Sequence, residues 1–135
     1  EPLSAWAEQA TEVRTYLYDP DPAVVRSGLI DVVADRLGLA RTDAEEEYLT
    51  GEHLTDSGFV TAFEVEAVFS KHLKDVSQYL RQNDPSTHYE VKCRRIPTDA
   101  RTVQRRLPVG SGPPRVLLFV RIAGRASIVL ARRLS

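Results

Sequence analysis

Histidine and cysteine side chains, which carry much of the nucleophilic and metal-binding chemistry of proteins, are scarce in this chain. The 135 residues contain three histidines, His53, His72 and His88, and one cysteine, Cys93. No paired histidine spacing such as His-Glu-x-x-His and no second cysteine accompanies them, so we expect no metal site and no cofactor. A single cysteine also excludes an internal disulfide. Cys93 falls on the apolar face of its predicted strand, which indicates a buried structural thiol.

Arginine is the abundant functional side chain, and its distribution along the sequence is uneven. Residues 93–135 contain ten Arg, no Lys and one acid, Asp99, so this segment has a net charge of +9. Residues 1–92 contain 18 acids and 8 bases, a net charge of −10, and the total of −1 hides this contrast. Such asymmetry indicates an acidic partner, such as a nucleic acid or a membrane surface, or else neutralisation of one half by the other.

The first two-thirds of the chain shows apolar residues at helical spacing. We predict helices over about 4–18, 22–37, 42–49 and 61–81. In the second of these, Asp21 is the expected N-cap, Pro22 is the first helical residue and Gly38 is the stop.

The last third changes to the two-residue alternation of strands. We predict strands over 89–93, 102–107, 115–122 and 126–133. Helices followed by strands indicate an α+β fold, with an N-terminal bundle of three to four helices followed by a three- to four-stranded antiparallel β-meander. We expect one compact domain over 1–135, in which residues 1–84 are helical and residues 87–135 form the meander. The absence of Met, including at the start, favours a domain excised from a longer chain.

Strand alternation places basic residues on the sheet face that we expect to turn away from the helices. The predicted binding residues on this face are Lys92, Arg94, Arg106, Arg115, Leu117, Phe119, Arg121 and Arg133. Exposed aromatic and Arg side chains are typical of protein–protein interfaces. We therefore favour a non-catalytic interaction module that uses an Arg-rich face around Phe119 for protein–protein assembly, with another protein or a second copy as its partner.

RNA is the alternative partner for the same face, because guanidinium groups bind phosphates and Phe119 could stack on a base. Helices followed by a small antiparallel sheet also resemble the barnase-, EndoU- and RelE-like ribonucleases. That resemblance lies in the order of elements and implies metal-independent RNA cleavage, in which His88, Lys92, Arg94 and Arg121 would act on the scissile phosphate. The interaction-module hypothesis, in contrast, assigns no catalytic residue.

A membrane span is excluded by the hydropathy pattern. The longest apolar run, Val116 to Val120, is far shorter than the ~20 residues that a spanning helix needs. The N-terminus shows no basic and apolar signal pattern, and with a single cysteine this favours an intracellular location.

Overall fold

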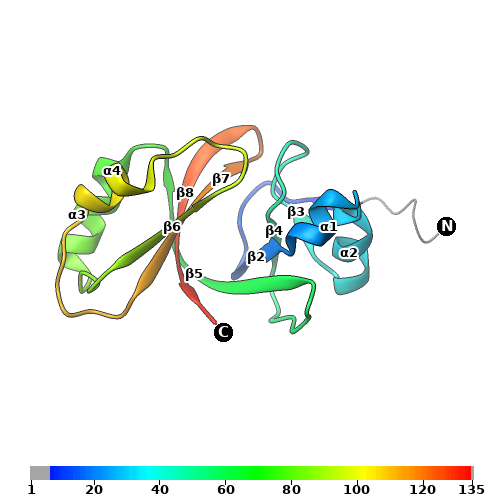
Figure 1. Ribbon diagram of the computed structural model, residues 1–135, viewed down its shortest axis with the longest axis horizontal. Helices are drawn as coiled ribbons and strands as arrows, with labels where there is room; N and C mark the ends of the chain where they lie inside the picture. The colour runs from blue at the N-terminus through cyan, green and yellow to red at the C-terminus, as the bar shows by residue number, and fades with distance from the viewer. Residues whose placement is uncertain (1–6, 135) are drawn as a thin grey trace.

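The computed structural model describes residues 7–134, which form one mixed sheet with short helices at the two ends of the molecule (Figure 1). Within these residues the sheet has eight strands in the order β1-β3-β4-β2-β5-β8-β7-β6. The long strand β5 (Val60–Ser70) crosses the middle. It joins an N-terminal region, residues 7–59, to what we call the β5–β8 unit, residues 60–133. No helix in the described residues is long and apolar enough to cross a membrane.

The N-terminal region contains short strands and two short helices. Its elements are β1 (Glu8–Gln9), β2 (Tyr16–Pro20), α1 (Pro22–Arg26), α2 (Ile30–Leu37), β3 (Ala40–Arg41) and β4 (Leu49–Gly51). Helix α1 begins as predicted, because the Asp21 carboxylate accepts a 2.8 Å hydrogen bond from the Ala23 N–H and Pro22 stands at the first helical position. Gly38 ends α2 in the left-handed conformation at φ 69°, which confirms its predicted role, but the single helix predicted over 22–37 is wrong, because α1 and α2 are separate helices.

The β5–β8 unit continues from β5 with two helices and three further strands. These elements are α3 (Leu73–Gln82), β6 (Tyr89–Cys93), α4 (Ala100–Arg105), β7 (Arg115–Ile122) and β8 (Arg125–Arg133). The strands predicted over 89–93 and 115–122 are confirmed, and the strand predicted over 126–133 begins one residue earlier. Helix α4 connects the parallel strands β6 and β7, and β8 then returns antiparallel between β7 and β5.

The predicted N-terminal helical bundle is wrong. Residues 42–49 contain no helix, and the described residues of the predicted helix 4–18 contain β1 and the start of β2. Residues 1–6 lie outside the described range. The predicted helix 61–81 is strand β5 followed by the shorter helix α3.

The sequence of β5 fits both the helical spacing and the two-residue alternation of a strand. Pairing with neighbouring strands decides between these two structures. Phe63 and Ala67 are four residues apart, as on one face of a helix. However, apolar residues from Phe63 to Phe69 also alternate with Glu64 and Glu66, which is typical of a strand. Both edges of β5 are hydrogen-bonded in the fold, to β2 on one side and to β8 on the other. Tertiary pairing therefore favours the extended form.

The predicted antiparallel meander is also wrong, because the expected strand 102–107 is helix α4. Asp99 caps this helix by accepting hydrogen bonds from the N–H groups of Arg101 and Thr102. Val103 and Leu107, which are four residues apart, are both buried in the core beneath it. A helical crossover between two strands makes them parallel, so β6 and β7 run in the same direction.

The crossover buries the sheet face that the sequence predicted to be exposed. On β7, Leu117 and Phe119 pack in a cluster with residues of α3 and α4, and Leu117 is 0% exposed. Val116 and Leu118, on the opposite face of β7, pack against Leu17 and other residues of the N-terminal region. Both faces of this strand are therefore covered, and its arginines lie near the strand ends.

Candidate functional site

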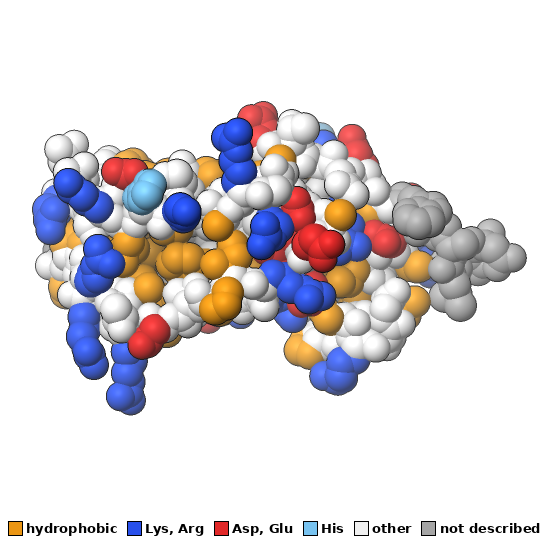
Figure 2. Space-filling model, turned by 90° about the horizontal axis from the view of Figure 1, so that it is seen from above, with side chains coloured by type: hydrophobic (Ala, Val, Ile, Leu, Met, Phe, Trp, Pro, Cys, Tyr) orange, Lys and Arg blue, Asp and Glu red, His pale blue; other side chains and the backbone are white. Residues whose placement is uncertain are grey.

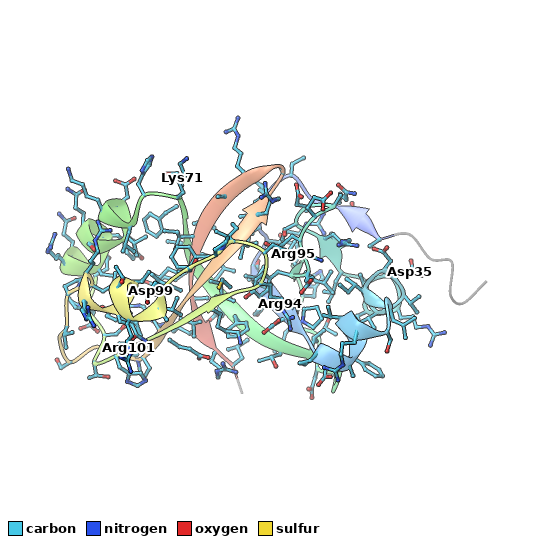
Figure 3. The ribbon with its side chains drawn as sticks, turned by 45° about the horizontal axis from the view of Figure 1, so that its top comes forward. Asp35, Lys71, Arg94, Arg95, Asp99 and Arg101 are labelled. Atoms are coloured by element: carbon cyan, nitrogen blue, oxygen red, sulfur yellow. The ribbon has the colours of Figure 1, made fainter. Side chains whose placement is uncertain are left out.

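Ion pairs join the two regions of the molecule where β6 ends, beside Arg94 and Arg95, which Figure 3 labels. Asp19 of β2 contacts Lys92 at 3.1 Å and Arg94 at 2.6 Å. Glu47 contacts Arg94 at 3.1 Å and Arg95 at 2.9 Å. Burial acts to lower the pKa of Arg94, but the hydrogen bond and charge of Asp19 and the charge of Glu47 outweigh burial and raise that pKa. The acidic and basic halves of the sequence thus neutralise each other at this junction.

A buried carboxylate holds the N-terminal region against the edge of β7 beyond the last residue of β6. Glu46 is 0% exposed, and it accepts hydrogen bonds from the backbone N–H groups of Arg121 at 2.7 Å and Glu47 at 2.9 Å. Burial raises the pKa of Glu46, although these N–H groups act to lower it. Thr42 adds a hydrogen bond to the Arg121 carbonyl at 2.8 Å. These contacts fix the orientation of the N-terminal region on the β5–β8 unit.

Arg115 organises the other end of β7. Its guanidinium is almost fully buried and contacts the Glu66 carboxylate at 2.8 Å. It also donates to the carbonyls of Asn83 and Asp84 and to the hydroxyl of Ser86, at 2.8, 2.7 and 3.0 Å. This residue therefore ties the loop after α3 to β5 and β7, and it is a structural contact rather than a ligand group.

Seven Lys and Arg residues of the β5–β8 unit are exposed and have no ion-pair partner among the described residues. They are Lys71, Lys74, Arg81, Arg101, Arg105, Arg106 and Arg125. All except Arg125 lie on or directly beside α3 and α4, and we call these six residues the α3–α4 cationic face. Figure 2 shows Lys and Arg side chains gathered at this end of the molecule, whereas basic and acidic side chains lie together in the middle.

The local sequence explains why these side chains point outward. Helix α3 buries Leu73, Val76, Ser77 and Leu80, which leaves Lys74 and Arg81, two turns apart, on its outer side.

On α4, the residues Arg101 and Arg105 are four positions apart and share the outer side, while Val103 faces the core. The Ser77 hydroxyl donates a 3.0 Å hydrogen bond to the Arg106 carbonyl and links the two helices. The six charges are therefore displayed from one packed helical layer.

The structure does not bring the predicted binding residues together on one exposed face. Lys92 and Arg94 are paired at the junction, and Arg115, Leu117 and Phe119 lie in or against the core. The alternation of residues along a strand does not reveal that α3 and α4 cover this face, so the sequence predicts a free surface where the structure has a core.

The remaining predicted residues are separated from one another. Arg106 follows α4 and is exposed on the cationic face. Arg121 is half-buried, with its Nε buried and lacking a hydrogen-bond partner among the described residues. Arg133 is the last residue of β8, far along that strand from the turn near Arg121. It pairs with Glu90 at 2.8 Å and lies 5.1 Å over the ring of Phe63.

The ribonuclease set is likewise not assembled. His88 precedes β6 at its start, whereas Arg94 follows its end, so about 20 Å of extended chain separates them. Arg94 is also engaged by two carboxylates. The geometry therefore lacks an acid–base pair placed around one phosphate.

The histidines and the cysteine do not form a reactive cluster. His53, His72 and His88 are exposed at three separate positions. Cys93 is exposed, contrary to the predicted buried thiol, because it ends a strand at the edge of the sheet. Over residues 7–134, no three His, Cys, Asp or Glu side chains come together in a group that could hold a metal ion.

Comparison with known families gives a match to the β5–β8 unit. The family described as THUMP domain-like matches residues 60–133, more than half of the chain. The chain belongs to the THUMP domain-like family. The matched THUMP-like region holds 14 Lys and Arg against 6 Asp and Glu, a net charge of +8, and the 59 residues before it carry −9.

Several proteins that resemble this THUMP-like chain are named as methyltransferases. Two proteins from two strains of Mycobacterium tuberculosis, named as uncharacterized S-adenosylmethionine-dependent methyltransferases, are each 32% identical over 117 residues. The match covers 86% of this chain but 32% of theirs, so the chain spans about one third of the length of these relatives. A crystal structure from Porphyromonas gingivalis, assigned as a methyltransferase, has a TM-score of 0.73 at 21% identity, and the match covers 98% of this chain and 32% of that one.

These findings overturn the predicted non-catalytic protein-assembly module. The chain belongs to the THUMP domain-like family, and the two mycobacterial relatives are named as S-adenosylmethionine-dependent methyltransferases. The sequence reasoning also missed most of the cationic face. Arg101 and Arg105 stand four positions apart behind the capping residue Asp99, which is a helix signal, whereas the sequence prediction has a turn up to Ala100 and a strand over 102–107.

Proposed function

We propose that this chain is an RNA-binding domain of a longer S-adenosylmethionine-dependent methyltransferase. The THUMP-like family match supports RNA as the partner, and the names of the relatives support the reaction that binding would serve. The observation that carries the proposal is the α3–α4 cationic face. Unpaired guanidinium and ammonium groups at the surface are what phosphates of a nucleic acid backbone require.

The charge distribution supports this face over other basic regions of the chain. At the junction, Lys92 and Arg94 are neutralised by Asp19, and within the unit Arg115 is neutralised by Glu66. Cations that already have partners would have to break these contacts before they could bind phosphate. The six residues of the cationic face require no such exchange.

The residues of this chain do not fit the methyl donor, so we assign its site to another region of the longer protein. Nucleoside cofactors commonly bind at a glycine-rich turn between a parallel strand and a helix. In the β6–α4–β7 crossover, the turn from Arg94 to Asp99 contains no glycine. A pocket of about 380 Å³ lies beside this turn, but Lys92 and Arg94 in its wall are both paired with Asp19.

Binding of structured RNA as a function of salt concentration tests the proposal. Replacement of Arg101 and Arg105 by Gln removes two phosphate contacts, and the slope of log K against log salt should become shallower by about 1.4 to 1.8. The matched control replaces Arg26 and Arg36 by Gln. These residues also lie in the last turns of short helices and are exposed, but at the opposite end of the molecule.

We expect the control variant to bind RNA like the unmodified protein. An unchanged slope in the Arg101 and Arg105 variant, or equal losses in both variants, would refute the assignment of the face. Absence of RNA binding by the unmodified chain would refute the function itself.

A further inference from the structure

Arg95 differs from Arg94 at the junction, because its side chain is more exposed and its guanidinium has fewer partners. The side chain of Arg94 is 19% exposed, and all three of its nitrogens have partners, in Asp19, Glu47 and the Pro20 carbonyl. The side chain of Arg95 is 55% exposed, and its one ion pair among the described residues is the 2.9 Å contact from Nη2 to Glu47. An additional ligand could therefore approach the Arg95 guanidinium without moving the core.

Glu47 divides its carboxylate between these two arginines. Oε1 contacts Arg94 and Oε2 contacts Arg95. Asp19 also contacts Arg94. Arg94 therefore stays neutralised when Glu47 loses its contact with Arg95. The Glu47 side chain is 11% exposed, so this ion pair is open to solvent from the Arg95 side alone, and there a competing anion can approach the guanidinium.

Arg95 lies in the connection that leads directly to α4 (Figure 3). Arg101 follows it by six positions, so the two Cα atoms are at most about 20 Å apart. At the spacing of about 3.4 Å per nucleotide along one strand of a DNA double helix, this upper limit corresponds to about six nucleotides. An RNA backbone that follows α4 toward the junction would thus come within reach of Arg95.

We propose that Arg95 is a further RNA-phosphate contact, and that Glu47 competes with the RNA for its guanidinium. This inference rests on the proposed RNA-binding function. The phosphate replaces Glu47 Oε2 on Arg95, while Oε1 remains on Arg94. An arginine can bind a phosphate through two parallel hydrogen bonds, which favours the exchange once RNA is held by the cationic face. The acidic region of the chain thereby limits RNA affinity.

The test compares RNA affinity and its salt dependence in Glu47→Gln with a matched charge control, Glu45→Gln. Glu45 is exposed, has no ion pair in the described structure, and its replacement changes the net charge equally. Glu47→Gln should bind RNA about 2- to 5-fold more tightly, because the Glu47 charge no longer competes with phosphate for the Arg95 guanidinium. The salt slope of Glu47→Gln should match that of the unmodified protein, because Arg95 contacts phosphate in both complexes, whereas Arg95→Gln alone should make the slope shallower by about 0.7 to 0.9. Glu45→Gln should bind RNA like the unmodified protein, and adding Arg95→Gln to Glu47→Gln should abolish the gain in affinity.

The outcomes separate this inference from the function on which it rests. If Arg101→Gln with Arg105→Gln weakens binding but Glu47→Gln leaves it equal or weaker, the competition is refuted and RNA binding by the cationic face stands. If neither the unmodified chain nor Glu47→Gln binds RNA, both proposals are refuted.

A measurement on the unmodified protein does not depend on how the variants fold. Addition of RNA should shift the side-chain Nε–H signal of Arg95 in a nitrogen–proton spectrum, while the signal of the buried Arg115 stays in place. An unmoved Arg95 signal at saturating RNA would overturn the proposal.

Discussion

Removal of the Glu66 charge offers the clearest test of how the β5–β8 unit is held together. Glu66 contacts the buried Arg115 guanidinium at 2.8 Å and accepts a 2.8 Å hydrogen bond from the Tyr79 hydroxyl of α3. It therefore couples β5 to both β7 and the helix that displays Lys74 and Arg81 of the cationic face. We predict that Glu66→Gln lowers the free energy of unfolding by about 2 kcal/mol at pH 7.

The magnitude follows from the contacts that are lost and retained. Breaking a buried ion pair costs about 3–5 kcal/mol when one charge is left without compensation. Here three hydrogen bonds from Arg115, to Asn83, Asp84 and Ser86, persist, and the Gln amide oxygen can still accept one bond. The expected loss is therefore below that range. Since m in urea is about 1–3 kcal/mol per molar, the unfolding midpoint should fall by about 1 M.

The pH dependence of this loss has a definite sign. Burial acts to raise the pKa of Glu66, but the Arg115 and Tyr79 hydrogen bonds and the neighbouring charges outweigh burial and lower the pKa below 4.5. The stabilisation is fully present above pH 4.5 and is lost as the pH falls through the lowered pKa. The difference between the unmodified protein and Glu66→Gln should therefore shrink in acid.

Urea unfolding followed by circular dichroism measures this difference at several pH values. Glu90→Gln is the matched control, because Glu90 pairs with Arg133 where both side chains are about 40% exposed, and its loss should cost less than about 0.5 kcal/mol. Equal losses in the two variants at pH 7 would refute the argument, as would a Glu66→Gln loss that grows toward low pH.

Three further predictions concern other regions of the fold. Asp99→Ala should destabilise the protein by about 1 kcal/mol in urea unfolding, because α4 loses its N-cap, and an unchanged midpoint would contradict the role of this cap. Gly112→Ala should lower the melting temperature, because a Cβ there would overlap the Asp84 carbonyl. Gly58→Ala should be tolerated, because a Cβ at that position meets open space. Equal melting temperatures for the two variants would show that the close approach at Gly112 does not matter. Glu46→Gln should gain stability relative to the unmodified protein as the pH rises above 4.5. The raised pKa of Glu46 means that this buried side chain stabilises the fold most when it is protonated. A difference in thermal stability that stays constant with pH would count against this prediction.

Local signals predicted several elements with accurate bounds. The alternation of apolar and polar residues defined β6, and the run of residues 115–122 defined β7, since period two and β-branched side chains need no distant partner to be recognised. The Asp21–Pro22 pair and Gly38 marked helix ends for the same reason, because capping is a local interaction.

Where the spacing of apolar residues fits both a helix and a strand, tertiary contacts decide which of the two forms. Phe63 and Ala67 fit a helix and a strand equally, and β5 became extended because β2 and β8 pair with its two edges. Val103 and Leu107 fit a strand of alternating polarity as well, but their four-residue spacing instead buries both beneath α4.

The contrast between an acidic N-terminal region and a basic C-terminal one can be read directly from the amino-acid order, because net charge depends on composition and position alone. Which of the basic residues remain available to a ligand depends on the folded arrangement. Arg94 meets Asp19 across 75 positions of sequence, and Arg115 meets Glu66 across 49. Such pairings are set by the order of strands in the sheet, and they neutralise those arginines while leaving the charges on α3 and α4 free.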